Sequence, residues 1–322
     1  MRNLYLDSLK GFAIGLVVIG HVLQAFVQDW QNYPILKLIY MFHMPLFITI
    51  SGYFFSLSVQ KYTLITYIKK IFHRLLLPSI CWGVINCMAI IINKTIHNKP
   101  IDPLYCIQII TTGLWYLTLL FILSSIGAII HHNFNKHRWI AWGIIYLIVT
   151  FIIPYNTWMH NEIWVLLPFF LLGFHYYKLK NHPLWIAGIA LFIFVICYKF
   201  YTFHYSMYEI DTLQPDERFT AFVVRNLSGL SGIIITSYIC SLLYKIKVYQ
   251  IVFCYIGGIT FPIYVLHQYF LITNKIIDLH THNFIYILFI SIVVIILSIF
   301  TYKICSNKWI KKYLFGETRI YQ

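Results

Sequence analysis

The chain of 322 residues is too apolar to be an ordinary soluble protein. Hydrophobic residue types make up 60% of it and charged types 11%, and the mean hydropathy is +0.74, whereas soluble domains carry about 25% charged residues. This composition excludes a cytosolic enzyme, a secreted disulfide scaffold and a disordered chain. The net charge of +14 does not indicate nucleic acid as a partner, because the cations stand between apolar runs and form no basic stripe.

Apolar runs long enough to cross a bilayer recur along the whole chain. Because about 20 helical residues span the hydrocarbon core, these runs predict an all-α bundle of about ten membrane helices. The expected helices cover 9–28, 36–56, 75–93, 110–131, 138–153, 163–178, 184–203, 219–243, 251–272 and 283–304. No loop between them is long enough for a soluble domain, so residues 1–322 are expected to form one transmembrane domain. The Cys residues contain no C-x-x-C pair, and we expect no metal site.

The basic residues fall mostly on one side of this predicted bundle. When the connections are assigned alternately to two sides, 17 of the 24 Lys and Arg share a side with both termini, where Asp7 and Glu317 are the acids. Cytoplasmic loops carry the excess of Lys and Arg, so both termini are expected to be cytoplasmic. The sequence therefore predicts a multi-pass protein of the inner (plasma) membrane that contacts lipids, and it does not specify an oligomeric state.

The first expected helix carries two ionisable side chains on one face. Lys10 and His21 are eleven residues apart, which is within about 20° of three full turns and about 16 Å along the axis. Lys10 then lies at the cytoplasmic boundary, with Asp7 one turn earlier as a partner, and His21 lies near mid-membrane. Such residues are functional candidates by default. The alternative is a Lys that extends to the membrane surface and a His that is hydrogen-bonded to a neighbouring helix.

The second expected helix carries His43, near the depth of His21. The two imidazoles suit a base with a positioning group, and they equally suit a structural polar contact. Ser51 and Gly52 follow on the same helix. Such small residues let neighbouring helices approach closely.

A basic cluster, Lys69-Lys70-Ile71-Phe72-His73-Arg74, precedes the third expected helix. One interpretation is the ordinary cytoplasmic charge excess in contact with lipid headgroups. The other is a cytoplasmic site for a polyphosphate cofactor such as coenzyme A, because Arg and Lys bind phosphates well. In that case Lys70, His73 and Arg74 are the candidate ligands, and Lys10 adds a further cation.

Three further features lie toward the expected outer face. Trp115 and Tyr116 begin the fourth helix; they suit an interfacial aromatic belt, or a surface that stacks on sugar rings. Arg225 either extends outward or binds an anionic acceptor. His267 lies in the ninth helix, and together these residues are the candidate substrate-binding set with His43.

Several segments agree in order and spacing with a known family. They are Leu6-Asp7-Ser8-Leu9-Lys10-Gly11-Phe12-Ala13 through Gly20-His21, Phe42-His43-Met44-Pro45-Leu46-Phe47 through Ser51-Gly52-Tyr53, Arg74-Leu75-Leu76-Leu77-Pro78, Leu114-Trp115-Tyr116-Leu117, and Phe261-Pro262-Ile263-Tyr264-Val265-Leu266-His267. Together they resemble the acyltransferase 3 family of integral membrane O-acyltransferases, over nearly the whole chain. One position departs from the pattern: family members often carry two Arg spaced i, i+3 before the third helix, and here position 71 is Ile71.

The resemblance implies transfer of an acyl group, usually acetyl, from cytoplasmic acyl-coenzyme A to a hydroxyl of a sugar at or beyond the outer face. The implied acceptors are envelope polysaccharides or lipid-linked sugars. Acetyl-CoA is thus the expected donor, and Lys70 or His73 is expected to supply the charge that Ile71 lacks.

The residues suggest roles for such a reaction. A neutral imidazole is a suitable general base near pH 7, so His21 is expected to deprotonate the acceptor hydroxyl or to carry the acyl group transiently. Lys10 is expected to bind the donor's phosphates, with Asp7 orienting it. Two other classes remain open: a transporter or flippase for an envelope glycan or lipid, and a membrane sensor or assembly subunit.

Overall fold

A computed structural model describes residues 3–98, 100–154, 157, 159–175, 183–206, 209–272, 279–305 and 307–317. The structure is all-helical, with no strand in these ranges. The chain folds into two compact units, here called unit 1 (Met1–Phe54 with Trp164–Lys303) and unit 2 (Phe55–Ile163 with Ile304–Gln322).

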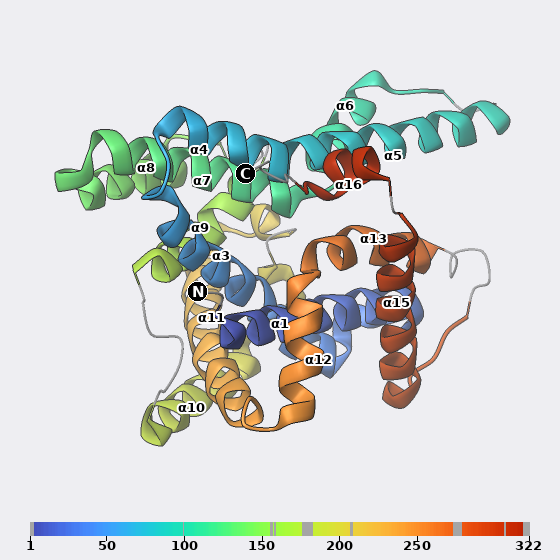
Figure 1. Ribbon diagram of the computed structural model, residues 1–322. Helices are drawn as coiled ribbons and strands as arrows, with labels where there is room; N and C mark the ends of the chain where they lie inside the picture. The colour runs from blue at the N-terminus through green and yellow to red at the C-terminus, as the bar shows by residue number, and fades with distance from the viewer. Residues whose placement is uncertain are drawn as a thin grey trace. The chain divides into compact units, whose positions relative to one another are not determined.

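Unit 1 combines the N-terminal helices with the helices of the second half of the chain up to α15 (Figure 1). Its elements are α1 (Leu4–Phe26), η1 (Trp30–Asn32), α2 (Pro34–Tyr40), most of α3 (His43–Val59), most of α9 (His160–His175), α10 (Leu184–Phe200), η4 (Phe203–Tyr205), η5 (Ile210–Thr212), α11 (Pro215–Leu243), α12 (Lys247–Gly258), α13 (Thr260–Ile272) and α15 (Phe284–Ile304).

Unit 2 is built from the middle of the chain and the C-terminal segment. Its elements are α4 (Leu64–Ile71), η2 (Phe72–Leu76), α5 (Leu77–Ile96), α6 (Pro103–Thr112), α7 (Trp115–Asn133), η3 (Asn135–His137), α8 (Arg138–Phe151) and α16 (Lys308–Phe315). Helix α16 lies beside α5, as Figure 1 shows.

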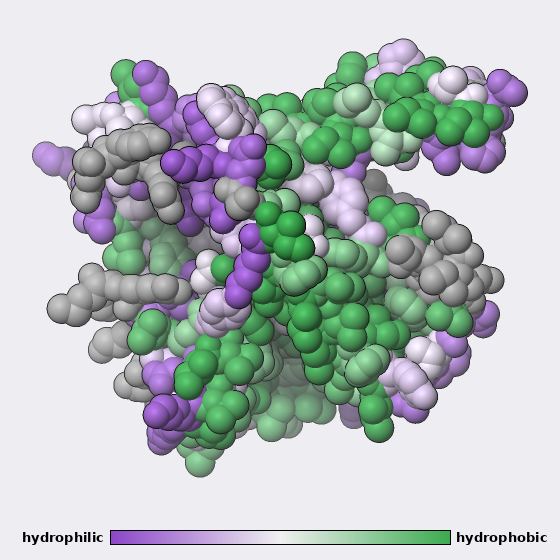
Figure 2. Space-filling model, turned by 45° about the vertical axis from the view of Figure 1, so that its right-hand side comes forward, coloured by the Kyte–Doolittle hydropathy of each residue, from purple (hydrophilic) through white to green (hydrophobic). Residues whose placement is uncertain are grey.

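Each of the ten expected segments contains helix, and several of these helices are suited to a membrane. Six helices among the described residues are long and apolar enough to cross a bilayer, or seven if the bent pair α12 and α13 is one span. Helices α8 and α10 are apolar but shorter. Broad areas of the surface in Figure 2 are apolar, as expected for a membrane protein. The count of about ten spans and the cytoplasmic termini stay predictions.

Three segments differ from the sequence-based boundaries. The segment 57–74, expected as a loop, contains α4, which continues through the π-helix η2 into α5. Pro78 explains the π-turn, because it has no N–H for the carbonyl of Arg74 and its ring crowds that carbonyl. The segment 251–272 is two helices bent by 80°, where Pro262 follows Gly258 by four residues and leaves that carbonyl without its helical donor. The segment expected to begin at 110 is interrupted at 113–114.

Glycines let helix α1 pack closely on α12. A Cβ atom at Gly11 would collide with the carbonyl oxygen of Phe253, and a Cβ at Gly257 would collide with the carbonyl oxygen of Asp7. Close backbone approach through small residues replaces the hydrophobic driving force between helices in lipid. This contact fixes the N-terminal half of α1, which carries Lys10.

A similar contact joins α3 and α9. A Cβ at Gly52 would meet the carbonyl oxygen of Phe170, and one at Gly173 would meet that of Thr49. The Thr49 hydroxyl also donates a hydrogen bond to the carbonyl of Phe169, at 3.1 Å. The prediction that Gly52 permits close helix packing is confirmed.

Replacing Gly11 with Ala is expected to destabilise the protein by about 1–3 kcal/mol, because the added methyl overpacks the α1–α12 contact. Gly15→Ala is the matched control on the same helix, since a Cβ at Gly15 meets no atom within 4 Å. Thermal unfolding of the two purified variants in detergent measures the difference. Equal melting temperatures for both variants would contradict the proposed contact.

Candidate functional site

Three histidines from three helices of unit 1 lie in one neighbourhood. The rings of His21 in α1 and His267 in α13 have centroids 5.1 Å apart, with a tilt of 38°. His43, at the first residue of α3, interacts electrostatically with His21 and with Arg225 in α11. Helix α1 contacts both α11 and α13 (Figure 1). The structure thus brings together four residues that the sequence singled out as candidates for the site.

All three imidazoles are hydrogen-bonded at Nδ1. Nδ1 of His43 lies 2.8 Å from the carbonyl oxygen of Ile39, and Nδ1 of His267 lies 3.0 Å from that of Ile263. Nδ1 of His21 lies 2.9 Å from Oε1 of Gln24. Because a backbone carbonyl only accepts hydrogen bonds, neutral His43 and His267 carry the proton on Nδ1 and a lone pair on Nε2, and the Gln24 oxygen favours the same tautomer for His21.

The three imidazoles differ in accessibility. His43 is 6% exposed and His267 is fully buried, whereas His21 is half-buried. Nε2 of His267 is buried and has no hydrogen-bond partner among the described residues. A buried polar atom of this kind costs about 1–3 kcal/mol, and such exceptions are frequent at functional sites. His21 is therefore the member of the group that a substrate can reach.

Arg225 is buried in the protein, 3% exposed. Its guanidinium donates a hydrogen bond to the carbonyl oxygen of Tyr205 at 2.8 Å and lies 3.5 Å from the Tyr201 hydroxyl. Nε of Arg225 is buried without a partner among the described residues. Arg225 therefore anchors the segment after α10, and the buried Nε leaves one donor for another group.

Aromatic side chains connect this segment to His43. The ring of Phe203 lies 4.8 Å from that of Trp30 and 5.7 Å from that of Tyr40, and the Tyr40 ring lies 4.8 Å from that of His43. Sequence reasoning missed these contacts and the hydrogen bond between His21 and Gln24. Gln24 was detectable in principle, because it follows His21 by three residues on the same helix.

At the other end of α1, Asp7 and Lys10 form the ion pair that their spacing predicts. Lys10 Nζ lies 2.7 Å from Asp7 Oδ1, and the Asp7 side chain is the more buried of the two. Lys10 Nζ also lies 4.8 Å from the centre of the Phe54 ring. Because α1 is one unbroken helix from Leu4 to Phe26, the spacing of about three turns between Lys10 and His21 holds.

The predicted phosphate ligands lie in unit 2. His73 and Arg74 are exposed on the π-helix η2. Lys70 donates a hydrogen bond to the Tyr62 hydroxyl at 2.7 Å and lies over the Tyr62 ring; this bond and the Lys70 charge lower the pKa of Tyr62. Arg74 forms no ion pair in the part of the chain that the structure describes. Exposed cations without counter-ions suit an anionic ligand.

The remaining predicted residues, Trp115 and Tyr116, begin α7 in unit 2, with ring centres 6.0 Å apart. Tyr116 is 6% exposed, so Trp115 is the ring with surface available to a ligand.

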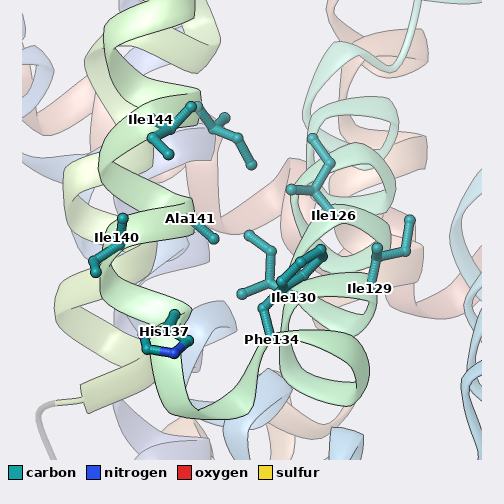
Figure 3. A pocket seen from close by; sticks show the side chains of 9 residues that line it. Ile126, Ile129, Ile130, Phe134, His137, Ile140, Ala141 and Ile144 are labelled. Atoms are coloured by element: carbon teal, nitrogen blue, oxygen red, sulfur yellow. The ribbon is translucent and has the colours of Figure 1, made fainter.

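A pocket of about 400 Å³ lies between α7 and α8, as Figure 3 shows. Its lining is Ile126, Ile129, Ile130, Phe134, His137, Ile140, Ala141, Ile144 and Ile145. This lining suits hydrocarbon, and His137 is its one titratable side chain.

Comparison with known proteins supports the resemblance. A family model described as an acyltransferase domain, of the acyltransferase 3 family, matches residues 3–303. The nodulation protein NolL of Mesorhizobium japonicum is 41% identical over 86 residues, which are 25% of this chain and 23% of that protein. NolL of Sinorhizobium fredii is 39% identical over 85 residues, with the same shares. The chain thus spans less than a quarter of the length of these relatives, and no solved structure matches it.

The family match covers most of the chain, and the matched range includes His21, His43, Arg225 and His267. His21, His43 and Arg225 lie in apolar helices of membrane-spanning length. His267 lies in the bent pair of α12 and α13, which together reach that length. The chain belongs to the acyltransferase 3 family of membrane O-acyltransferases.

Proposed function

We propose that this protein transfers an acetyl or other short acyl group from cytoplasmic acyl-coenzyme A to a hydroxyl of an envelope sugar, either in a polysaccharide or on a lipid carrier. The observation that carries the proposal is a half-buried imidazole, His21, grouped with two buried imidazoles inside a family member's apolar bundle. Family membership favours acyl transfer over the transporter or flippase alternative.

His21 acts as the general base in this proposal. Its Nε2 lone pair accepts the proton of the acceptor hydroxyl while the hydroxyl oxygen bonds to the thioester carbonyl carbon. The carbon–sulfur bond then breaks, and His21 returns the proton to the departing thiolate. The hydrogen bond from Nδ1 to Gln24 supports this direction, because it leaves Nε2 free to accept.

We assign His267 and His43 to hold and stabilise His21. Both are too buried to bind the acceptor directly in this arrangement. The Nε2 lone pair of His267, buried and unpartnered, suits the stabilisation of a positive charge on the neighbouring His21 ring. The ring of His43 is held in orientation by the hydrogen bond from its Nδ1 to the carbonyl of Ile39.

Cations on three elements, α1 in unit 1 and α4 and η2 in unit 2, are proposed as contacts for the acyl donor. Lys10, paired with Asp7, stands at the opposite end of α1 from His21. Lys70, His73 and Arg74 form the basic cluster of η2 and its neighbour α4. Phosphates on coenzyme A are suitable partners for these groups, and the chemistry requires no metal.

The acceptor is proposed to approach from the outer face. Trp115, on α7, is the candidate contact for a sugar, whereas Arg225, 3% exposed, is too buried to touch the acceptor in this arrangement and is assigned to hold the segment after α10. This arrangement corresponds to a multi-pass protein of the inner (plasma) membrane with both termini in the cytoplasm, as the distribution of Lys and Arg predicts.

Replacing His21 with Ala is expected to reduce acyl transfer at least about 100-fold, because loss of a general base typically costs 10²–10⁴-fold. Mass spectrometry of the envelope glycans of cells that make wild-type or variant protein measures the mass gain of one acetyl unit per sugar. His131→Ala is the matched control: His131 is also half-buried in an apolar helix, but it lies in unit 2.

If the His21→Ala variant is present at normal abundance and no acetylation is detected, the assignment of His21 as the general base is supported. Retained acetylation would refute it, and a change in glycan amount or location without any change in acylation would favour the transporter.

Replacing His267 with Leu is expected to lower kcat about 10- to 100-fold while leaving KM for the donor unchanged, because a misplaced or less stabilised base slows chemistry without weakening binding. His267→Gln, which keeps an acceptor oxygen, is expected to recover part of the rate. Steady-state kinetics of the purified variants measure this split. Equal rates for the Leu and Gln variants would exclude the proposed contact with His21.

A further inference from the structure

The C-terminal helix α16 is held against the π-helix η2 and α5 within unit 2. The indole N–H of Trp82 donates a hydrogen bond to the carbonyl of Leu314 at 2.8 Å, and the Trp82 and Phe315 rings are 6.2 Å apart. Gly316, which ends α16 at a φ of +62°, packs directly on the backbone of Arg74. A side chain there would collide with the Arg74 carbonyl, so the glycine permits α16 to end beside Arg74.

Helix α16 presents three cations on one face. Lys308, Lys311 and Lys312 are spaced i, i+3 and i+4, and Phe315, which is buried near Trp82, continues the same face. The helix itself contains no acidic residue; Glu317 follows it, and its backbone N–H donates a hydrogen bond to the carbonyl of Lys311 at 3.1 Å. Arg74 is exposed and forms no ion pair with a described residue. The end of α16 thus lies beside the backbone of Arg74, and the three Lys follow one another along α16.

A stacked pair of aromatic rings lies next to these cations. The rings of Trp309 and Tyr313 are parallel within 3°, with centres 5.8 Å apart, and Trp309 is 66% exposed. Lys312 Nζ lies 5.7 Å from the Trp309 ring centre and 5.2 Å from that of Tyr313. Exposed aromatic rings beside Lys and Arg are the usual combination for stacking a nucleobase and binding its phosphates.

We propose that α16 and Arg74 form a nucleotide-binding surface for the adenosine-phosphate end of a thioester donor. Trp309, which Tyr313 supports from its other side, stacks on the purine, and Arg74 with the three Lys bind the phosphates. The identity of the donor rests on the proposed acyl transfer; the preference for a purine with phosphates rests on this surface alone. A phospholipid headgroup offers a phosphate but no purine, so the aromatic pair favours a nucleotide.

The test is equilibrium binding to the purified full-length protein in nanodiscs of neutral lipid. The probes are coenzyme A, adenosine 3′,5′-bisphosphate, pyrophosphate and pantetheine, which lacks the nucleotide. The triple variant Lys308→Gln, Lys311→Gln, Lys312→Gln is compared with the control Lys61→Gln, Lys245→Gln, Lys247→Gln. The control removes equal charge from exposed positions at other helix ends.

The α16 variant is expected to bind coenzyme A and the bisphosphate at least about tenfold more weakly, since charge-assisted hydrogen bonds are lost. Pantetheine binding is expected to be unchanged, as is coenzyme A binding by the control. Trp309→Leu is expected to weaken binding of the bisphosphate but not of pyrophosphate.

Wild-type affinity in the α16 variant would overturn the proposal, as would an equal loss for pantetheine. Loss confined to binding of phosphatidylglycerol vesicles would assign α16 to the lipid surface instead. Nucleotide binding that depends on α16, in a protein that transfers no acyl group, would support this surface and refute the proposed function. If the protein transfers acyl groups but its nucleotide binding does not depend on α16, the proposed function would be supported and this surface would be refuted.

Discussion

A polar group inside an apolar bundle must find its hydrogen-bond partner within the protein, and this constraint shapes the histidine site. His43 and His267 each use Nδ1 on a carbonyl four residues earlier in the chain, and His21 uses Nδ1 on Gln24. These local bonds hold the rings in orientation and leave the Nε2 atoms as acceptors. The same constraint explains Arg225, which satisfies a backbone carbonyl in the segment after α10. Packing of the helices then determines which of the acceptors a substrate can reach.

Helix α1 sets the geometry of unit 1, because it carries both the ion pair and the accessible imidazole. Its close contact with α12 depends on Gly11 and Gly257 and lies beside Asp7, while its later turns approach α13 and His267. The 80° bend between α12 and α13 lets two consecutive helices meet different parts of α1. If α12 and α13 formed one straight helix, that helix could not contact both the early and the late turns of α1 in this way. The break at Pro262 is therefore part of what positions His267.

The sequence was informative where a regular helix fixes distances, and less so where distant segments meet. The Asp7–Lys10 pair and the common helix of Lys10 and His21 followed from spacing alone. The approach of His267 to His21 did not, because it depends on how α13 packs on α1. Helix α16 lies beyond the last helix that the sequence predicts, 283–304. Its start signal, Asn307, and its end signal, Gly316, are both present in the sequence, but the length of eight residues falls below what hydropathy detects.

The three imidazoles of the candidate site differ in solvent exposure, and this difference suggests different roles for them. A base that exchanges protons with a hydroxyl and a thiolate must touch both, and His21 is the member of the trio that retains accessible surface. Exposing all three rings would admit water, which competes for the thioester. Burying all three would exclude the acceptor. One half-buried ring backed by buried rings satisfies both requirements, so the burial of His43 and His267 is consistent with roles exerted through His21 and argues against independent contacts with a substrate.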